Sequence, residues 1–217
     1  TSLDMALPDP ESPAGKADWN SFLKKVLPYL DITPFSAEEA MFMLNRRKFN
    51  EIKKQCEGRD PIEFYEIDDF IDIATTLLRY GAKIAVLKCG AKGILLATSN
   101  IRAIRNMGKA SPANSEAWAD KILWHNVFEV KKIVSATGAG DNAIAGFLSA
   151  FLRGSSPEEA LAAACCAGAQ NLLVVDAVSG IKSWEHTIQL SKRWKVKDYK
   201  PGKNWRYNAP WRIWEKT

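Results

Sequence analysis

The stretch Ile133-Val-Ser-Ala-Thr-Gly-Ala-Gly-Asp-Asn142 is the part of the sequence that decides the fold class. Its first two residues are β-branched and favour the end of a strand, and its glycines favour a tight turn. The residues that follow place apolar side chains at helical spacing, namely Ile144, Phe147, Leu148, Phe151 and Leu152. A strand, a glycine turn and an amphipathic helix in immediate succession predict an α/β architecture.

This turn also predicts a binding site for an anion. The backbone N–H groups of Gly138, Ala139 and Gly140 are expected to be unpaired at the start of a helix, where the helix dipole attracts negative charge. Asp141 would place a carboxylate beside a bound phosphate, where a base could take a proton from an attacking hydroxyl. The same residues also suit a plain tight turn with an acid in the first helical turn, and spacing alone leaves both interpretations open.

Two well-known phosphate loops are excluded at this turn. No Gly-Lys-Ser/Thr follows the glycines, as a Walker loop requires. The third glycine and the distant acid of the dinucleotide-binding pattern are missing as well.

Strands and helices alternate along most of the chain, which favours a mainly parallel central sheet. Helices are predicted at residues 19–27, from about Ser36, at 67–80 and from Ser156, where Ser-Pro-Glu-Glu is a capping box. Strands are predicted at 1–7, 29–33, 83–88, 94–97 and 128–134, with a hairpin turn at 89–93. Residues 99–124 show no clear period and are interpreted as loop with short strands.

The composition is that of an ordinary globular protein, with 47% hydrophobic and 25% charged residues among 217. The net charge of +5 suits an anionic ligand without indicating nucleic acid. The four cysteines match no zinc pattern, so we expect buried free thiols and a reducing, cytoplasmic location. No segment has the apolar length of a membrane span, so no membrane partner is expected. The chain opens without methionine in an apparent strand, so we expect residues upstream of Thr1.

The last residues are basic and aromatic. Residues 191–217 carry nine Lys and Arg against two acids, and tryptophans and tyrosines are interleaved with them. Such a segment could bind single-stranded nucleic acid through charge and stacking. No recognised RNA-binding motif accompanies it, so we favour a tail that packs on the domain with its tryptophans inward.

The glycine turn resembles a family signature. Thr137-Gly-Ala-Gly-Asp141, followed by Ala143, Gly146 and Phe147, is similar to the signature of the ribokinase-like (PfkB) carbohydrate kinases. Lys88-Cys-Gly-Ala-Lys-Gly93 resembles the nucleotide-contacting turn of that family. Ser36-Ala-Glu-Glu39 stands where the family has an Asn-x-x-Glu element. The resemblance runs to about Trp184 and corresponds to the C-terminal portion of the family.

The resemblance implies a role for each matching residue. Asp141 would be the base for the substrate hydroxyl, and Gly138, Ala139 and Gly140 would form the anion hole. The residues implied along the nucleotide are Lys88, Gly90, Gly93 and Thr137. Glu39 would help to hold Mg²⁺, largely through water. The turn Asp176-Ala-Val-Ser-Gly180 would lie next to the adenine pocket.

The resemblance also implies a fold and an activity. We expect a three-layer ribokinase-like sandwich that lacks the N-terminal part and lid of the family, with an ATP-binding and phosphoryl-transfer part at 1–184 and the tail at 185–217. The implied reaction transfers a phosphoryl group from ATP, with Mg²⁺, to a hydroxyl of a sugar or related small molecule. A homodimer through the lid is possible, and nucleic acid is not an expected partner.

Two departures from the family leave an alternative. Ser135 stands where the family usually has an aspartate that often helps to bind a monovalent cation, and Ser36 replaces an asparagine. Ser36-x-x-Glu39 is also an ordinary capping box, and Lys88 could be an exposed lysine at a strand end. The alternative function is therefore that of a catalytically inactive kinase-fold binding or regulatory protein.

Overall fold

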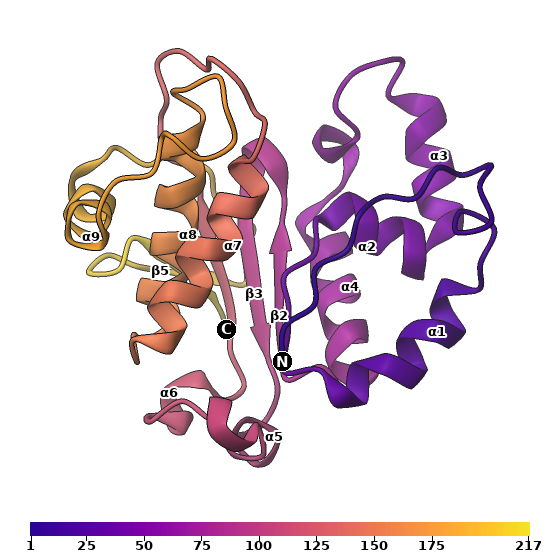
Figure 1. Ribbon diagram of the computed structural model, residues 1–217, viewed down its shortest axis with the longest axis horizontal. Coiled ribbons are helices and arrows are strands. Elements are labelled where there is room, and N and C mark those ends of the chain that lie inside the picture. Colours follow the sequence, from indigo (N-terminus) through magenta and orange to yellow (C-terminus); the bar gives the residue numbers. More distant parts are fainter.

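The computed structural model describes residues 1–217 as one six-stranded sheet covered by helices on both faces (Figure 1). The strands are β1 (Ile32–Thr33), β2 (Ile84–Lys88), β3 (Gly93–Thr98), β4 (Ile122–Asn126), β5 (Trp205–Asn208) and β6 (Ile213–Lys216). The helices are α1 (Trp19–Val26), α2 (Ala37–Leu44), α3 (Arg46–Gln55), α4 (Ile67–Arg79), α5 (Ile101–Arg105), α6 (Ser115–Trp118), α7 (Ala139–Leu152), α8 (Pro157–Asn171) and α9 (Trp184–Arg193). Helices α1–α4 lie on one side of the sheet and α7–α9 on the other.

The sheet is mostly antiparallel, so the expectation of a mainly parallel sheet is wrong. Its order is β1-β2-β3-β4-β6-β5, and only β1 and β2 pair in parallel. Helices α2–α4 supply the crossover between these two strands, as parallel pairing requires. A short turn at Gly90–Lys92 joins β2 to β3, which forces them to run antiparallel and confirms the predicted hairpin.

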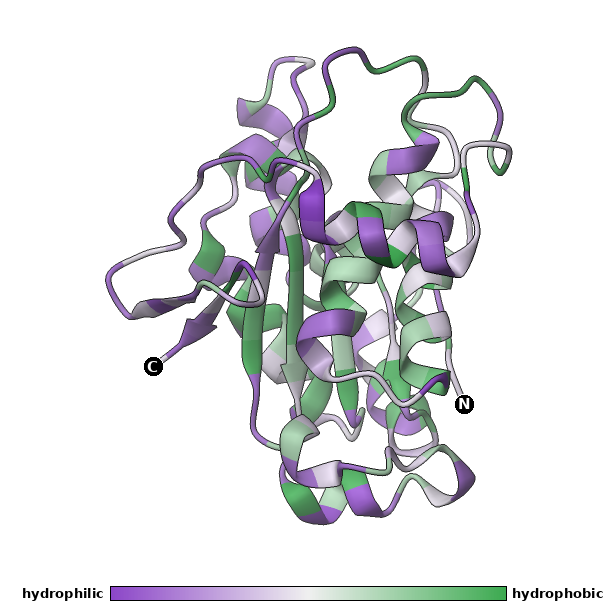
Figure 2. Cartoon of the chain, turned by 90° about the vertical axis from the view of Figure 1, so that its left-hand side faces the viewer, coloured by the Kyte–Doolittle hydropathy of each residue, from purple (hydrophilic) through white to green (hydrophobic).

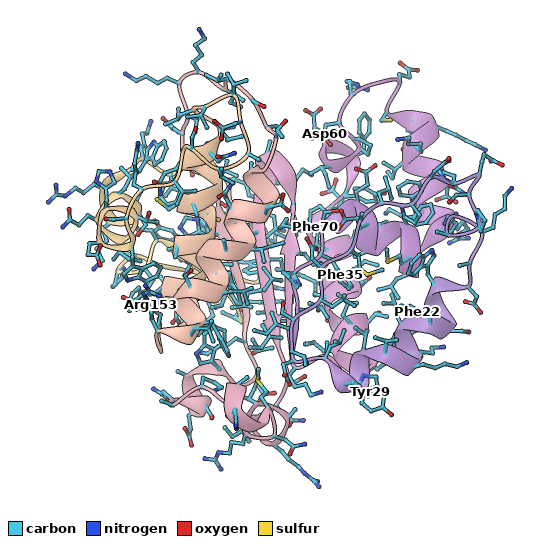
Figure 3. The ribbon with its side chains drawn as sticks, viewed as in Figure 1. Phe22, Tyr29, Phe35, Asp60, Phe70 and Arg153 are labelled. Atoms are coloured by element: carbon cyan, nitrogen blue, oxygen red, sulfur yellow. The ribbon has the colours of Figure 1, made fainter.

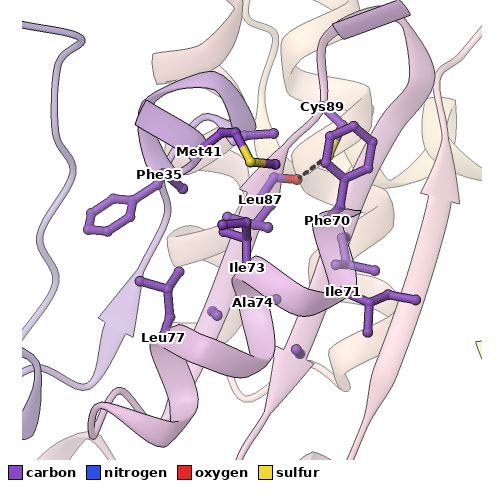
Figure 4. Packing of buried hydrophobic residues seen from close by; sticks show 14 of the residues in the cluster. Phe35, Met41, Phe70, Ile71, Ile73, Ala74, Leu77, Leu87 and Cys89 are labelled. Carbon is purple, nitrogen blue, oxygen red and sulfur yellow. Dashed lines mark hydrogen bonds between the residues drawn. The ribbon is translucent and has the colours of Figure 1, made fainter. Parts of the chain in front are cut away.

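The central strands are buried on both faces. On β2, Ala85 and Leu87 face the helices α1–α4, whereas Ile84 and Val86 face α7 and α8. Figure 2 shows the central strands in hydrophobic colours, and Figure 3 shows Phe35 and Phe70 between sheet and helices while Tyr29 lies at the rim. In the close view, side chains of α4 pack over Leu87 (Figure 4). The sheet thus separates two hydrophobic cores.

Helices α7 and α8 approach each other unusually closely, as their small residues predict. A β-carbon built on Gly146 would lie 2.7 Å from the carbonyl oxygen of Ala163 and 2.8 Å from the β-carbon of Ala167. Glycine at this position therefore allows two helices to meet almost backbone to backbone. The pair forms a rigid base for the turn at residues 135–140 that precedes α7.

Several local predictions were wrong. Residues 99–124 contain α5, α6 and the start of β4, because Asn100 and Asn114 cap two short helices. Strand β4 shows no alternation because it is buried on both faces. Residues 128–134 alternate but form only one isolated bridge, between Phe128 and Val196, and residues 1–7 likewise form only the bridge between Ser2 and Ile32.

The C-terminal residues contribute to the same sheet. The β5–β6 hairpin adds to the edge of β4 through β6, and Trp205 is buried while Trp214 packs against the core. Trp211 lies exposed nearby. The division of the chain at residue 184 stays a prediction. No helix has the length and apolar character needed to cross a membrane.

Replacing Gly146 by alanine tests the contact between α7 and α8. Helix propensity alone would stabilise α7 by about 1 kcal/mol. The new methyl would collide with backbone of α8, so we expect a net loss of about 1–2 kcal/mol in the free energy of unfolding. Urea unfolding measures this change. Ala145→Gly, at an exposed position of the same helix, reports propensity alone, and a stabilised Gly146→Ala protein would refute the packing argument.

The buried His125 predicts how stability changes with pH. Burial lowers the pKa of His125 to about 4, against a partly opposing hydrogen bond with the Asn126 carbonyl. The unfolded chain takes up a proton near pH 6.5 and the folded chain does not, so stability is complete above pH 6.5 and falls toward pH 4. We expect His125 to account for a loss of about 2–3 kcal/mol between pH 7 and pH 4.5. Urea unfolding should show a smaller loss in His125→Gln, and an equal loss in both proteins would contradict this account.

Candidate active site

The glycine turn, defined here as residues 135–140, leads into α7 without a side-chain cap. Gly138 is the N-cap residue with φ of 75°, a left-handed conformation that favours glycine. No backbone hydrogen bond engages the N–H groups of Gly138 and Gly140, whereas the N–H of Ala139 donates to the carbonyl of Ala136 at 3.2 Å. Two of the three predicted amides are therefore free at a helix start, and the third is partly engaged.

Asp141 lies in the first turn of α7 and is exposed. It lies at the positive end of the helix dipole. Because the side chain faces solvent directly beside the free amides, it can reach a molecule bound at the turn.

Lys88 lies between the two other segments that carry predicted site residues, the start of α2 and the glycine turn. It ends β2 and forms a parallel bridge with Ser36, which precedes α2. A β-carbon built on Gly140 would lie 3.9 Å from Nζ of Lys88. The start of α2, the end of β2 and the start of α7 therefore meet at one end of the sheet.

The Lys88 side chain is held in place rather than extended into solvent. Its ammonium donates to the two carboxylate oxygens of Asp4, at 3.1 and 3.3 Å. The side chain is only 14% exposed, which argues against a solvent-facing lysine at a strand end. The Lys88–Asp4 pair thus lies beside the free helix amides, and the carboxylate of Asp4 offsets the positive charge of the ammonium.

Glu39 forms the capping box that its spacing predicts. Its carboxylate accepts from the N–H of Ser36 at 2.8 Å, and the Ser36 hydroxyl accepts from the N–H of Glu39 at 3.1 Å. No group of three or more His, Cys, Asp or Glu side chains is arranged to hold a metal ion. Only one carboxylate oxygen of Glu39 is engaged in the capping box, so the other oxygen could accept from a water molecule of a hydrated Mg²⁺ ion.

The remaining predicted residues serve partly to shape the two turns. Gly90 is exposed in the turn after β2. Gly93 is buried, and a β-carbon there would lie 2.2 Å from the carbonyl of His125, so packing of β3 on β4 demands a glycine. Thr137 is exposed, and its N–H donates to the hydroxyl of Ser135 at 3.1 Å. Ser135 therefore orders the turn without a carboxylate.

Sequence reasoning missed two buried asparagines beside the turn. The side-chain amide of Asn142 donates to the carbonyls of Gly138 at 2.8 Å and Ala177 at 2.6 Å. That of Asn171 donates to the carbonyls of Thr137 at 2.7 Å and Asp176 at 3.2 Å. A polar residue at position 142, four residues before the buried Gly146, is the signal that could have identified the first.

The acceptor carbonyls of Ala177 and Asp176 belong to a loop at residues 172–181, here called the apolar loop. Hydrogen bonds from the Ser179 hydroxyl and from the N–H groups of Ser179 and Val178 lower the pKa of Asp176 to about 2. Val175 and Val178 are 77% and 70% exposed. The loop is thus internally ordered and offers an apolar surface next to the glycine turn.

Comparison with solved structures shows a ribokinase-like fold. A ribokinase of Arabidopsis thaliana, solved with ribose and ATP, is 20% identical with a TM-score of 0.55, over 78% of this chain and 43% of that one. A putative ribokinase II of E. coli, solved with ATP and Mg²⁺, is 18% identical with a TM-score of 0.53, over 80% and 43%. The aminoimidazole riboside kinase of Salmonella enterica, solved with aminoimidazole riboside and an ATP analogue, is 16% identical with a TM-score of 0.58, over 88% and 51%.

The chain thus spans about half the length of these solved structures or less. No curated protein matches its sequence significantly. The family model described as pfkB family carbohydrate kinase matches residues 4–184, which is most of the chain. Together with the fold and the placement of the signature residues, this match means that the chain belongs to the pfkB family of carbohydrate kinases.

Proposed function

We propose that this chain carries the ATP-binding and phosphoryl-transfer part of a kinase that phosphorylates a hydroxyl of a sugar or related compound. The observation that carries the proposal is the meeting of an exposed carboxylate, two free helix amides and a lysine ammonium at one end of the sheet. Ribose and aminoimidazole riboside, bound in two of the similar structures, support a sugar-like substrate.

In the proposed reaction Asp141 is the general base. The substrate hydroxyl oxygen forms a bond to the γ-phosphorus of ATP while the bond to the bridging oxygen breaks, and the hydroxyl proton passes to the Asp141 carboxylate. The free N–H groups of Gly138 and Gly140 would stabilise charge on the transferring group, with Ala139 contributing once its weak bond to Ala136 opens. These dipoles are oriented before the reaction, so they need little reorganisation.

The other nucleotide contacts follow from position. Lys88 would approach the phosphates, since its ammonium already lies beside Gly140. Gly90 and Thr137 are exposed and would lie along the nucleotide, whereas the buried Gly93 would act by shaping the turn. Exposed apolar residues of the apolar loop would face the base.

Glu39 would hold Mg²⁺ largely through water, because one carboxylate oxygen is engaged in the capping box. When bound, the ion would neutralise charge on the phosphates. The E. coli structure with ATP and Mg²⁺ supports this at the level of the fold.

We also propose a reducing, cytoplasmic environment, which is supported by four cysteines that are all free and buried. Homodimerisation stays a prediction. An inactive binding or regulatory protein is not favoured, because the carboxylate and the free amides that catalysis needs are all retained at the turn.

Asp141→Asn tests the catalytic base. We expect turnover of a sugar or nucleoside substrate to fall by at least about 100-fold while ADP affinity changes little, since only proton transfer is lost. Coupled-enzyme kinetics and calorimetric titration measure the two quantities in the full-length protein. Glu185→Gln is a matched control, because Glu185 is also an exposed acid in a first helical turn but lies in α9. Unchanged turnover in Asp141→Asn would reject the proposal.

Lys88→Met tests the phosphate contact. Removing a partly desolvated ammonium from beside the turn should weaken ADP binding about tenfold or more, since hydrogen bonds to charged groups contribute about 1.5–3 kcal/mol. Isothermal titration calorimetry measures the affinity. Lys121→Met is the matched control, because Lys121 is also partly buried and paired, with Glu215, on another part of the sheet. If both substitutions weakened ADP binding equally, the loss of affinity would be due to lower stability of the fold and not to a lost phosphate contact.

A further inference from the structure

The glycine turn and the apolar loop lie against each other at the top of α7 and α8 (Figure 1). The N–H of Val134 donates to the carbonyl of Leu172 at 2.8 Å. A β-carbon built on Gly138 would lie 2.5 Å from the carbonyl oxygen of Ala177, so the two backbones are in direct contact. The proposed anion site therefore has the apolar loop as its wall.

Two buried side chains hold this contact. Asn142 and Asn171 are 7% and 0% exposed, and each uses its amide group to bridge the turn and the loop. Asn142 joins Gly138 to Ala177, and Asn171 joins Thr137 to Asp176. A buried amide whose donors are satisfied only by this arrangement strongly disfavours separation of the two segments.

The same bonds orient the amides of the turn. A trans peptide group is planar, with its carbonyl and its N–H on opposite sides. Asn171 binds the carbonyl of Thr137, so it fixes the peptide plane that carries the N–H of Gly138 and directs this free N–H away from Asn171. The carbonyl of Gly138 accepts from the side-chain amide of Asn142 and, at 2.9 Å, from the backbone N–H of the same residue. Both bonds fix the plane that carries the N–H of Ala139.

We infer that Asn142 and Asn171 are positioning residues of the nucleotide site. They act through the glycine turn, whose N–H groups they aim, and they hold the apolar loop beside it so that phosphates and base are bound as one unit. This inference rests on the proposed function. Neither side chain needs to touch the nucleotide.

The test compares Asn142→Ala and Asn171→Ala with Asn126→Ala. Asn126 is a matched control, because it is a buried asparagine whose amide also donates to two carbonyls, those of Lys197 and Tyr199, and to neither the glycine turn nor the apolar loop. Binding of ADP and of inorganic tripolyphosphate is measured by calorimetry, and thermal unfolding is followed in parallel. All three variants should lose stability, but only the first two should lose affinity.

We expect ADP affinity to fall about tenfold in Asn142→Ala and Asn171→Ala, and tripolyphosphate affinity about threefold, because only ADP spans both segments. Normal ADP affinity in both variants would overturn the inference and leave the proposed function intact. Equal losses for the two probes would overturn the coupling between turn and loop. A wild-type protein that binds neither probe would instead reject the proposed function.

Hydrogen exchange gives a second readout that needs no ligand and tolerates a weakly stable variant. In Asn142→Ala the hydrogen-bonded amides of the turn and of the loop should exchange faster together, while those of β2 and β3 keep their rates. These amides include those of Thr137 and Ala139 in the turn and of Val178, Ser179 and Ile181 in the loop. Asn126→Ala should leave both segments protected as in the wild type. Faster exchange in only one of the two segments would contradict the inference that the asparagines hold the turn and the loop together.

Discussion

The close approach of α7 to α8 is the contact on which the rest of the site depends. Gly146 lets the two helices meet at a separation that any side chain would increase, and this fixes where α7 begins relative to where α8 ends. The glycine turn precedes the first helix and the apolar loop follows the second. Both segments of the proposed nucleotide site are therefore placed by one packing contact between small residues.

The polar groups at the site divide into two kinds. Neutral amides, from Asn142 and Asn171, are buried, and their N–H groups donate to backbone carbonyls, although Oδ1 of Asn171 has no partner. These two amides contribute geometry. The charged groups would contribute affinity and proton transfer. Asp141 is exposed, whereas Lys88 is 14% exposed and is paired with Asp4. This division follows from desolvation, because a buried neutral amide needs only hydrogen-bond partners, whereas a buried charge costs far more.

The parts of this structure that could be predicted from sequence are those governed by neighbours along the chain. Helix α7, the hairpin of β2 and β3, and the capping box at Glu39 follow from spacing within a few residues. The direction of the strands in the sheet does not follow from such spacing. One reason is that β4 pairs with β6, about ninety residues later in the chain. The other is that a strand buried on both faces shows no alternation of apolar and polar residues. Asp4 was missed for the same reason, since its partner Lys88 lies on another element.

The geometry of the candidate site also depends on contacts between residues that are distant along the chain. The signature residues identify the turn, but the orientation of its amides depends on carbonyls that are held from Asn171, more than thirty residues away. Ser135 illustrates the point, because its hydroxyl accepts from the N–H of Thr137 and so supports the turn where an aspartate is usual. A serine at this position therefore supplies a hydrogen bond to the turn without adding a negative charge beside the proposed anion site.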